Sequence, residues 1–196
     1  LSIFSFTSFF LLKNKCLFID KKNLKKLNFE NPDNLAVMNL ECGNVIIELY
    51  PDISPKAVER FKTLIKKKMY DGSAFYKVVE NTLVQAGDIE FGNIDYLDYS
   101  KIGSGKSGLG LLKSELSDDF EFTEGSIGFA RSTEFDSEDS EFFITLKEIP
   151  IYQGEYTPIG KVKYGLDILK KIKTGNKAIY VLRPDYINTF RMLETN

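Results

Sequence analysis

A cation and an amide on neighbouring predicted strands are the side chains best placed to do chemistry in this chain. Lys77 lies in the β-type run 75–79, and Gln85 lies eight residues later in a second run, 82–86. Residues separated by an even number along a strand share a face, so we expect both side chains on one side of a strand pair. This arrangement predicts a polar site on a β surface.

Composition sets broad limits on the fold and on the partners. The chain has 196 residues, of which 43% are hydrophobic, so it is long enough to bury the core of one domain. The net charge of -2 provides no strongly basic face, and we therefore predict no nucleic-acid partner.

The absence of histidine excludes several kinds of site. A Ser-His or Cys-His nucleophile pair, an imidazole base and a His-ligated zinc site all require that residue. Cys16 and Cys42 are too few for a four-thiolate metal site, and neither belongs to a CxxC motif. We predict no metal site and no disulfide between the two.

Residues 1–30 are interpreted as an N-terminal extension that precedes a domain over residues 31–196. The apolar run 1–12 is followed by a lysine-rich stretch. A membrane-spanning helix needs about 20 residues, whereas a run of this length suits an export signal or the remnant of an anchor. The alternative is an N-terminal β-strand or an unstructured tail. An export signal would make the protein periplasmic or membrane-associated through its N-terminus; otherwise we expect it in the cytoplasm.

The pattern of elements favours a mainly β fold. Residues 37–40 and 45–49 predict a hairpin, and Ser54 before Pro55 predicts the N-cap of an amphipathic helix that runs to Lys68. A glycine-rich surface loop is expected at 92–110 and a short helix at 165–173. The other predicted strands cover 74–79, 82–86, 125–130, 142–146 and 157–163. Strands in this order fit a closed antiparallel barrel capped by two helices.

An acidic stretch lies between Glu115 and Glu141, where ten acidic residues accompany one base, Arg131. Runs of this kind usually form a solvated face. The alternative interpretation is a surface that prefers basic segments of client proteins.

Taken in order, several segments resemble the cyclophilin family of peptidyl-prolyl cis-trans isomerases. They are VIIELYPDISPKAVERF, YDGSAFYKVVENTLVQAGD, LLKSELSDDFEFTEGSIGFARS, SEFFITL and GEYTPIGKVKYGLDIL. The resemblance covers about residues 35–193, and LKSELS is most similar to bacterial members. It implies a closed eight-stranded antiparallel β-barrel capped by two α-helices.

The resemblance also implies an activity: rotation about X-Pro bonds in client proteins, which assists their folding. Such rotation faces a barrier of roughly 18 to 20 kcal/mol because the C–N bond has double-bond character. A donor directed at the prolyl nitrogen favours the twisted transition state, without a cofactor or a covalent intermediate. The expected partners are proline-containing segments of clients, and we expect a monomer.

The resemblance assigns roles to particular residues. Lys77 stands where the family has its catalytic arginine, and Gln85 matches a glutamine that fixes the peptide and the arginine. Phe143 matches the floor of the proline pocket. The other substrate-binding positions it implies are Phe129 beside that floor, Ala130, Arg131 and Ser132 along the peptide backbone, and Tyr156 at the rim.

Four substrate-site positions depart from the family pattern. Lys77 lacks the planar fork of arginine, so the resemblance implies reduced isomerase activity. Thr82 replaces a phenylalanine and Ile151 a tryptophan, which predicts a less aromatic pocket. Glu141 replaces a glutamine and is expected to draw Lys77 into a salt bridge. The alternative function is a catalytically impaired, peptide-binding chaperone or scaffold.

Overall fold

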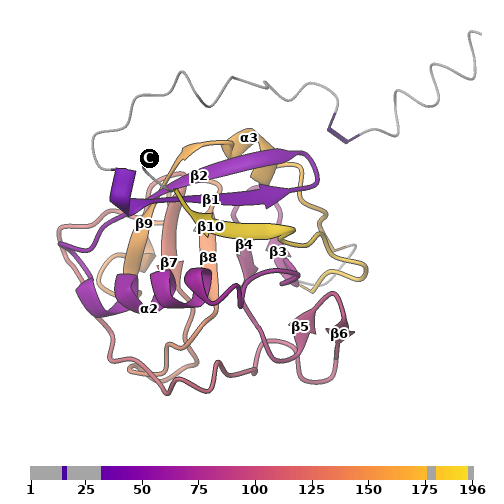
Figure 1. Cartoon of the computed structure of the whole chain (residues 1–196). Helices are drawn as coiled ribbons and strands as arrows, with labels where there is room; N and C mark the ends of the chain where they lie inside the picture. Colours follow the sequence, from indigo (N-terminus) through magenta and orange to yellow (C-terminus); the bar gives the residue numbers. More distant parts are fainter. Residues whose placement is uncertain (1–14, 17–31, 176–179, 194–196) are drawn as a thin grey trace, which may run out of the picture.

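The computed structural model describes residues 15–16, 32–175 and 180–193, and its main feature is one curled antiparallel sheet (Figure 1). The eight strands of this sheet follow the order β10-β1-β2-β9-β7-β8-β4-β3. Their bounds are β1 Leu35–Leu40, β2 Gly43–Leu49, β3 Lys77–Val79, β4 Leu83–Ala86, β7 Ser126–Phe129, β8 Phe142–Thr145, β9 Pro158–Tyr164 and β10 Thr189–Met192. A separate two-stranded ribbon pairs β5 (Gly92–Asn93) with β6 (Tyr96–Leu97).

The first hairpin forms where the alternating pattern predicts it. β1 pairs with β2 in antiparallel register from Leu35↔Glu48 to Leu40↔Gly43. Residues at every second position, such as Met38 on β1 and Val45 and Ile47 on β2, enter the hydrophobic core. Strand periodicity therefore predicted both the hairpin and its buried face.

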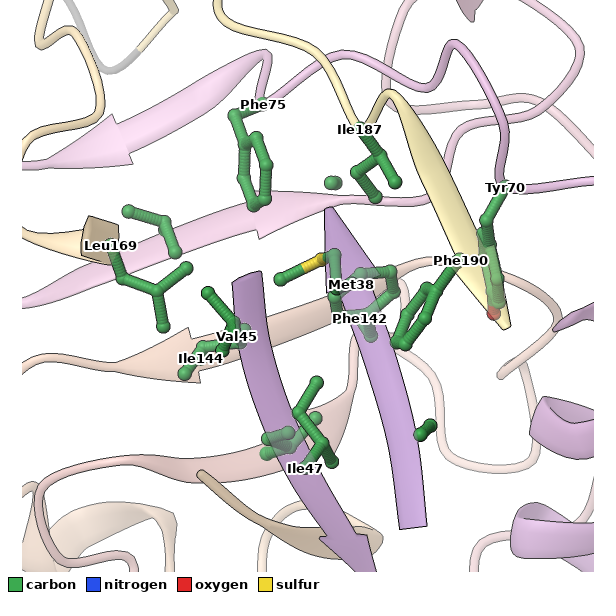
Figure 2. Packing of buried hydrophobic residues seen from close by; sticks show 14 of the residues in the cluster. Met38, Val45, Ile47, Tyr70, Phe75, Phe142, Ile144, Leu169, Ile187 and Phe190 are labelled. Carbon is green, nitrogen blue, oxygen red and sulfur yellow. The ribbon is translucent and has the colours of Figure 1, made fainter. Parts of the chain in front are cut away.

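The core lies between the curled sheet and the helix α2 (Pro55–Lys66). Phe61 on α2 makes edge contacts with Phe129, Phe142 and Phe190, at ring-centroid distances of 5.9, 5.2 and 5.6 Å. Figure 2 shows Phe142, Phe190 and Tyr70 gathered with aliphatic side chains from other strands.

The helix α2 starts where predicted, but Ser54 is not the residue that accepts hydrogen bonds from its first backbone N–H groups. Ser54 occupies the N-cap position, but its hydroxyl donates to the carbonyl of Pro158 instead of capping the helix. The carboxylate of Glu115 accepts hydrogen bonds from the backbone N–H groups of Ala57 (2.8 Å) and Lys56 (3.3 Å). A remote acidic residue therefore caps the helix and complements its dipole.

Two features of the predicted barrel need correction. The term "closed" was an overstatement, because β3 and β10 are the two edges of the sheet and form no ladder with each other in the described chain. The second helix, α3, covers only Leu166–Leu169, since the chain continues through tighter turns. Figure 1 shows α2 and α3 at opposite ends of the sheet, as expected for capping helices.

The predicted absence of a disulfide was wrong. Cys16 is bonded to Cys42, which lies in the β1–β2 turn, with the two Cα atoms 5.1 Å apart. Lys15 reinforces this contact through ion pairs with Glu41 (2.7 Å) and Asp185. The 26-residue separation carried no recognisable spacing motif, and only the folded chain brings the two thiols together.

The predicted signal or anchor at residues 1–12 lies outside the described residues. Among the helices that the structure describes, none is long and apolar enough to cross a membrane.

We expect the disulfide to stabilise the domain measurably. Closing a loop of this size contributes about 2 to 4 kcal/mol by restricting the unfolded chain. The double variant Cys16→Ser/Cys42→Ser should lose this amount in urea unfolding, and reduced wild type should show the same loss. The variant itself should not respond to reductant. An unchanged unfolding midpoint in wild type whose thiols are shown to be reduced would contradict the expectation.

Candidate functional site

A row of directly paired residues crosses four strands and forms the base of the site. Lys77 on β3 pairs with Gln85 on β4, Gln85 pairs with Phe143 on β8, and Phe143 pairs with Gly128 on β7. Directly opposed residues of antiparallel strands project to the same face. The register therefore places the predicted cation, amide and aromatic floor side by side on the outer face of the sheet.

Gly128 leaves room for the ring of Phe143. A Cβ atom at this position would lie 2.6 Å from Cζ of Phe143 and 2.9 Å from Cε1 of Phe122, so any side chain here would force these rings to move. Phe143 thus lies across the bare backbone of β7. It belongs to an outer aromatic cluster whose buried members are Leu83, Phe120, Phe122, Phe143 and Ile149.

The cluster is more aromatic than the sequence predicted. Tyr152 and Tyr156 meet Phe143 edge-on, at centroid distances of 5.3 and 5.2 Å, and lie 4.5 Å from each other. Tyr152 belongs to the short 3-10 helix η3 (Pro150–Tyr152) and was missed, although the spacing of two tyrosines four residues apart around this turn was a usable signal. The rings leave Phe143 only 3% exposed.

Three predicted substrate-site residues have surroundings that differ from those of Phe143. Phe129 alternates to the opposite side of β7, where it is fully buried in the interior core against Phe61. Ile151 is 78% exposed and projects into solvent. Thr82 lies just before β4, where its hydroxyl donates to the carbonyl of Glu80 (3.1 Å).

Glu141 belongs to a buried hydrogen-bond network and not to the expected salt bridge with Lys77. Its Oε2 atom accepts hydrogen bonds from the hydroxyl of Tyr76 and from Nε2 of Gln85 (2.9 Å). Gln85 also donates to the Tyr76 oxygen at 2.5 Å. Within the described chain, Lys77 forms no ion pair with Glu141, and that part of the prediction was wrong.

Burial sets the protonation behaviour of this network. Desolvation raises the pKa of the Glu141 carboxyl, and it outweighs the hydrogen bonds from Tyr76 and Gln85, which act in the opposite direction. Burial and the nearby Glu141 charge likewise raise the pKa of the Tyr76 hydroxyl, so that Tyr76 remains a donor. The network holds the Gln85 amide in one orientation.

Arg131, the arginine beside the site, is fully engaged. Its guanidinium donates to the carbonyls of Glu155, Ser132 and Thr133, and to the Glu155 carboxylate. It also lies over the rings of Phe135 and Tyr156, 4.2 and 5.0 Å from their centroids. Arg131 is therefore a structural clamp for this corner and is not available as the missing catalytic arginine.

A polar pocket of about 360 Å³ opens beside the aromatic cluster. Lys77, Gln85 and Glu141 line it together with Ala130, Arg131 and Ser132, whereas Phe143 and Tyr156 lie outside its lining. Across the described residues, the Lys77 ammonium makes no ion pair or side-chain hydrogen bond. Lys77 is thus a cation available to a ligand at the edge of the sheet.

Asp88 builds the far wall of the pocket. This fully buried carboxylate accepts hydrogen bonds from the backbone N–H groups of Gly103 (2.6 Å), Gly105 (3.1 Å) and Phe91 (2.8 Å). A Cβ atom at Gly105 would lie 2.0 Å from its Oδ1, so only glycine allows this approach. Residues 103–106 of the predicted surface loop form this wall, which carries Lys106 at the pocket.

The polar groups of the site are suited to binding and orienting a peptide. Within the residues described, no group of three or more Cys, Asp or Glu side chains is arranged to hold a metal ion. What the surface combines is an apolar aromatic cluster, a fixed amide and an available ammonium group.

Comparisons with other proteins identify the family. The model of the cyclophilin type peptidyl-prolyl cis-trans isomerase family matches residues 35–191. A probable peptidyl-prolyl cis-trans isomerase of Brucella suis is 39% identical over 149 residues, 76% of each chain. A peptidyl-prolyl cis-trans isomerase of Acinetobacter baylyi is 28% identical over 153 residues, also 76% of each chain.

Solved structures show the same fold at lower sequence identity. A cyclophilin from Hirschia baltica superposes with a TM-score of 0.69 at 20% identity, covering 82% of this chain and 74% of its own. A cyclophilin type isomerase from Cryptosporidium parvum, crystallised in the presence of the dipeptide Ala-Pro, gives 0.70 at 23% identity and covers 83% and 99%. With its curled eight-stranded sheet, two capping helices and family match over nearly the whole domain, this chain belongs to the cyclophilin-type peptidyl-prolyl cis-trans isomerases.

Proposed function

We propose that this chain isomerises X-Pro bonds of client proteins with reduced efficiency, using Lys77 as the donor to the twisting imide. The single observation that carries the proposal is the row Lys77–Gln85–Phe143, which sets an available cation and a fixed amide beside an aromatic surface. The Ala-Pro dipeptide present with the Cryptosporidium parvum relative supports proline-containing ligands.

The expected mechanism is electrostatic. A client lies along the outer face with its proline against the aromatic cluster of Phe143, Tyr152 and Tyr156. The Lys77 ammonium donates toward the prolyl nitrogen as its lone pair leaves resonance, which favours the twisted state over both planar states. Gln85, held by Tyr76 and Glu141, hydrogen-bonds the client backbone.

Reduced efficiency follows from the chemistry of lysine. A guanidinium is planar and can donate to the imide while its other nitrogens are held by neighbours. An ammonium on a flexible stem loses more rotamer freedom when it is held in one geometry, and within the described chain no side chain of the site positions Lys77.

A second candidate function is a peptide-binding module with little catalysis. It is favoured by the two tyrosines that cover the ring of Phe143. Only 3% of this residue is exposed, because Tyr152 and Tyr156 pack against its ring. A client proline must then bind against the tyrosines or displace them. Substitutions at Lys77 separate the two candidates.

The variants Lys77→Ala and Lys77→Arg test the role of the cation. One transition-state donor contributes about a hundred- to a thousandfold in rate, and lysine should retain part of that. We expect kcat/KM to fall by about tenfold or more in Lys77→Ala and to rise by about tenfold in Lys77→Arg, measured by NMR exchange on a short X-Pro peptide.

The matched control is Lys67→Arg on the exposed end of α2, which should leave the rate unchanged. If wild type and Lys77→Ala both match the uncatalysed rate while Lys77→Arg gains activity, the chain is a binding module and the catalytic proposal fails.

The variant Glu141→Gln tests the buried network through stability. Because burial raises the pKa of Glu141, ionising it destabilises the folded state, and wild type loses stability as pH rises above the ordinary range of a glutamate, about 4.3. An amide oxygen can accept the same two hydrogen bonds without ionising. Glu141→Gln should therefore unfold at a higher urea concentration than wild type at pH 7, with no advantage at pH 4.

Glu148→Gln, at an exposed position, serves as the control and should show no such pH-dependent difference. A Glu141→Gln protein less stable than wild type at pH 7 would mean that the carboxylate form is the one the network favours.

A further inference from the structure

We infer that the polar pocket beside the aromatic cluster selects clients with an acidic side chain near the proline, and that Lys106 is the residue that sets this preference. The inference rests on the proposed function, because it assigns a specificity to the same peptide-binding surface. It concerns the chemistry of the client and not the isomerisation step itself.

The pocket lies directly beside the expected position of the proline. Ala130 packs against the aromatic cluster and also lines the pocket. On the other side, Lys77 and Gln85 line the pocket and belong to the row that ends at Phe143. A peptide extended across Phe143 therefore places a side chain near the proline over the pocket.

The acidic groups of the pocket already have partners. Asp139, 5% exposed, accepts hydrogen bonds from the backbone N–H of Ser107 (2.7 Å), the Ser107 hydroxyl and Nη1 of Arg60 (3.1 Å). Glu141 accepts from Tyr76 and Gln85. Both carboxylates are therefore hydrogen-bonded within the protein, Glu141 through its Oε2 atom, and the nearby Lys106 charge partly offsets the charge of Glu141.

The two lysines of the pocket, unlike its carboxylates, have no side-chain partner within the described chain. In the part of the chain that the structure describes, neither the Lys77 nor the Lys106 ammonium forms an ion pair or a side-chain hydrogen bond. Lys106 is exposed, and its backbone N–H is held by the Glu90 carboxylate at 2.8 Å. Two available ammonium groups facing one pocket favour an anionic group.

The wall that carries Lys106 is held by hydrogen bonds within the chain. Asp88 anchors the backbone of Gly103 and Gly105, and the close approach at Gly105 allows no side chain there. The position of the Lys106 backbone is therefore defined, which lowers the entropic cost of recognition.

The structure argues against the alternative that the acidic stretch 115–141 binds basic clients. Three of its carboxylates serve the fold. Glu115 caps α2, Glu138 accepts from Ser114 and Thr157, and Glu124 pairs with Lys170. The exposed acidic residues of the stretch, among them Asp118, Asp119, Glu121 and Glu134, do not line the pocket, whereas Lys77 and Lys106 do.

The test uses the full chain and fluorescent peptides with one proline and one variable residue. Glutamate, glutamine or lysine is placed one, two or three residues before the proline, or one or two after it, and binding is measured by anisotropy. At one position or more, glutamate should bind about two- to fivefold more tightly than glutamine, the range of a solvent-exposed ion pair. The advantage should vanish at about 1 M salt, where charges are screened beyond about 3 Å.

Variants of Lys106 identify the residue responsible. Lys106→Gln should remove the glutamate advantage, and Lys106→Glu should reverse it in favour of lysine, while Lys67→Gln should keep it. Thermal unfolding of each variant establishes that it is folded. Equal binding of glutamate and glutamine peptides at every position, tighter binding of lysine peptides by wild type, or a glutamate advantage that survives Lys106→Gln would each overturn the inference.

Two independent readouts separate this inference from the proposed function. Isomerisation of the glutamine peptides without any glutamate advantage in binding refutes the acidic preference and leaves catalysis standing. A glutamate advantage in binding with no isomerisation of any peptide supports the preference and refutes catalysis.

Discussion

The register of β3, β4, β8 and β7 is the constraint on which the site depends. A shift of one residue in any of these strands would turn its site residue inward. The alternate positions, such as Val84 and Ile144, form the core, so burial of the core and presentation of the site are set by the same pairing. Stability of the sheet therefore maintains Lys77, Gln85 and Phe143 on one surface.

Buried carboxylates organise the polar half of the site around this row. Asp88 anchors the wall carrying Lys106, Asp139 ties Ser107 to Arg60, and Glu141 orients Gln85. Each of these carboxyl groups is hydrogen-bonded within the protein, as buried polar groups require. Lys77 and Lys106 line the same pocket and form no ion pair within the described chain, so two available cations lie beside this row although the net charge of the chain is negative.

Much of the fold was predictable because strand alternation and helix signals are local. The β1–β2 hairpin, the start of α2 at Pro55 and the shared face of Lys77 and Gln85 followed from such patterns. The errors arose where a side chain's surroundings come from distant segments. Phe129 and Phe143 are both strand phenylalanines, yet one faces the interior core and the other the outer cluster, and family resemblance alone assigned both to the pocket.

The sequence by itself determined the family, the antiparallel architecture and the substitution of lysine for arginine, because these depend on residue type, order and local period. Only the tertiary structure decided which groups meet. In the folded chain, Tyr152 packs against Phe143 and Cys16 is bonded to Cys42. Glu141 accepts hydrogen bonds from Tyr76 and Gln85 and does not form the expected ion pair with Lys77. Such contacts depend on how the chain curls and on which groups can be buried together with their partners, and no local pattern carries that information.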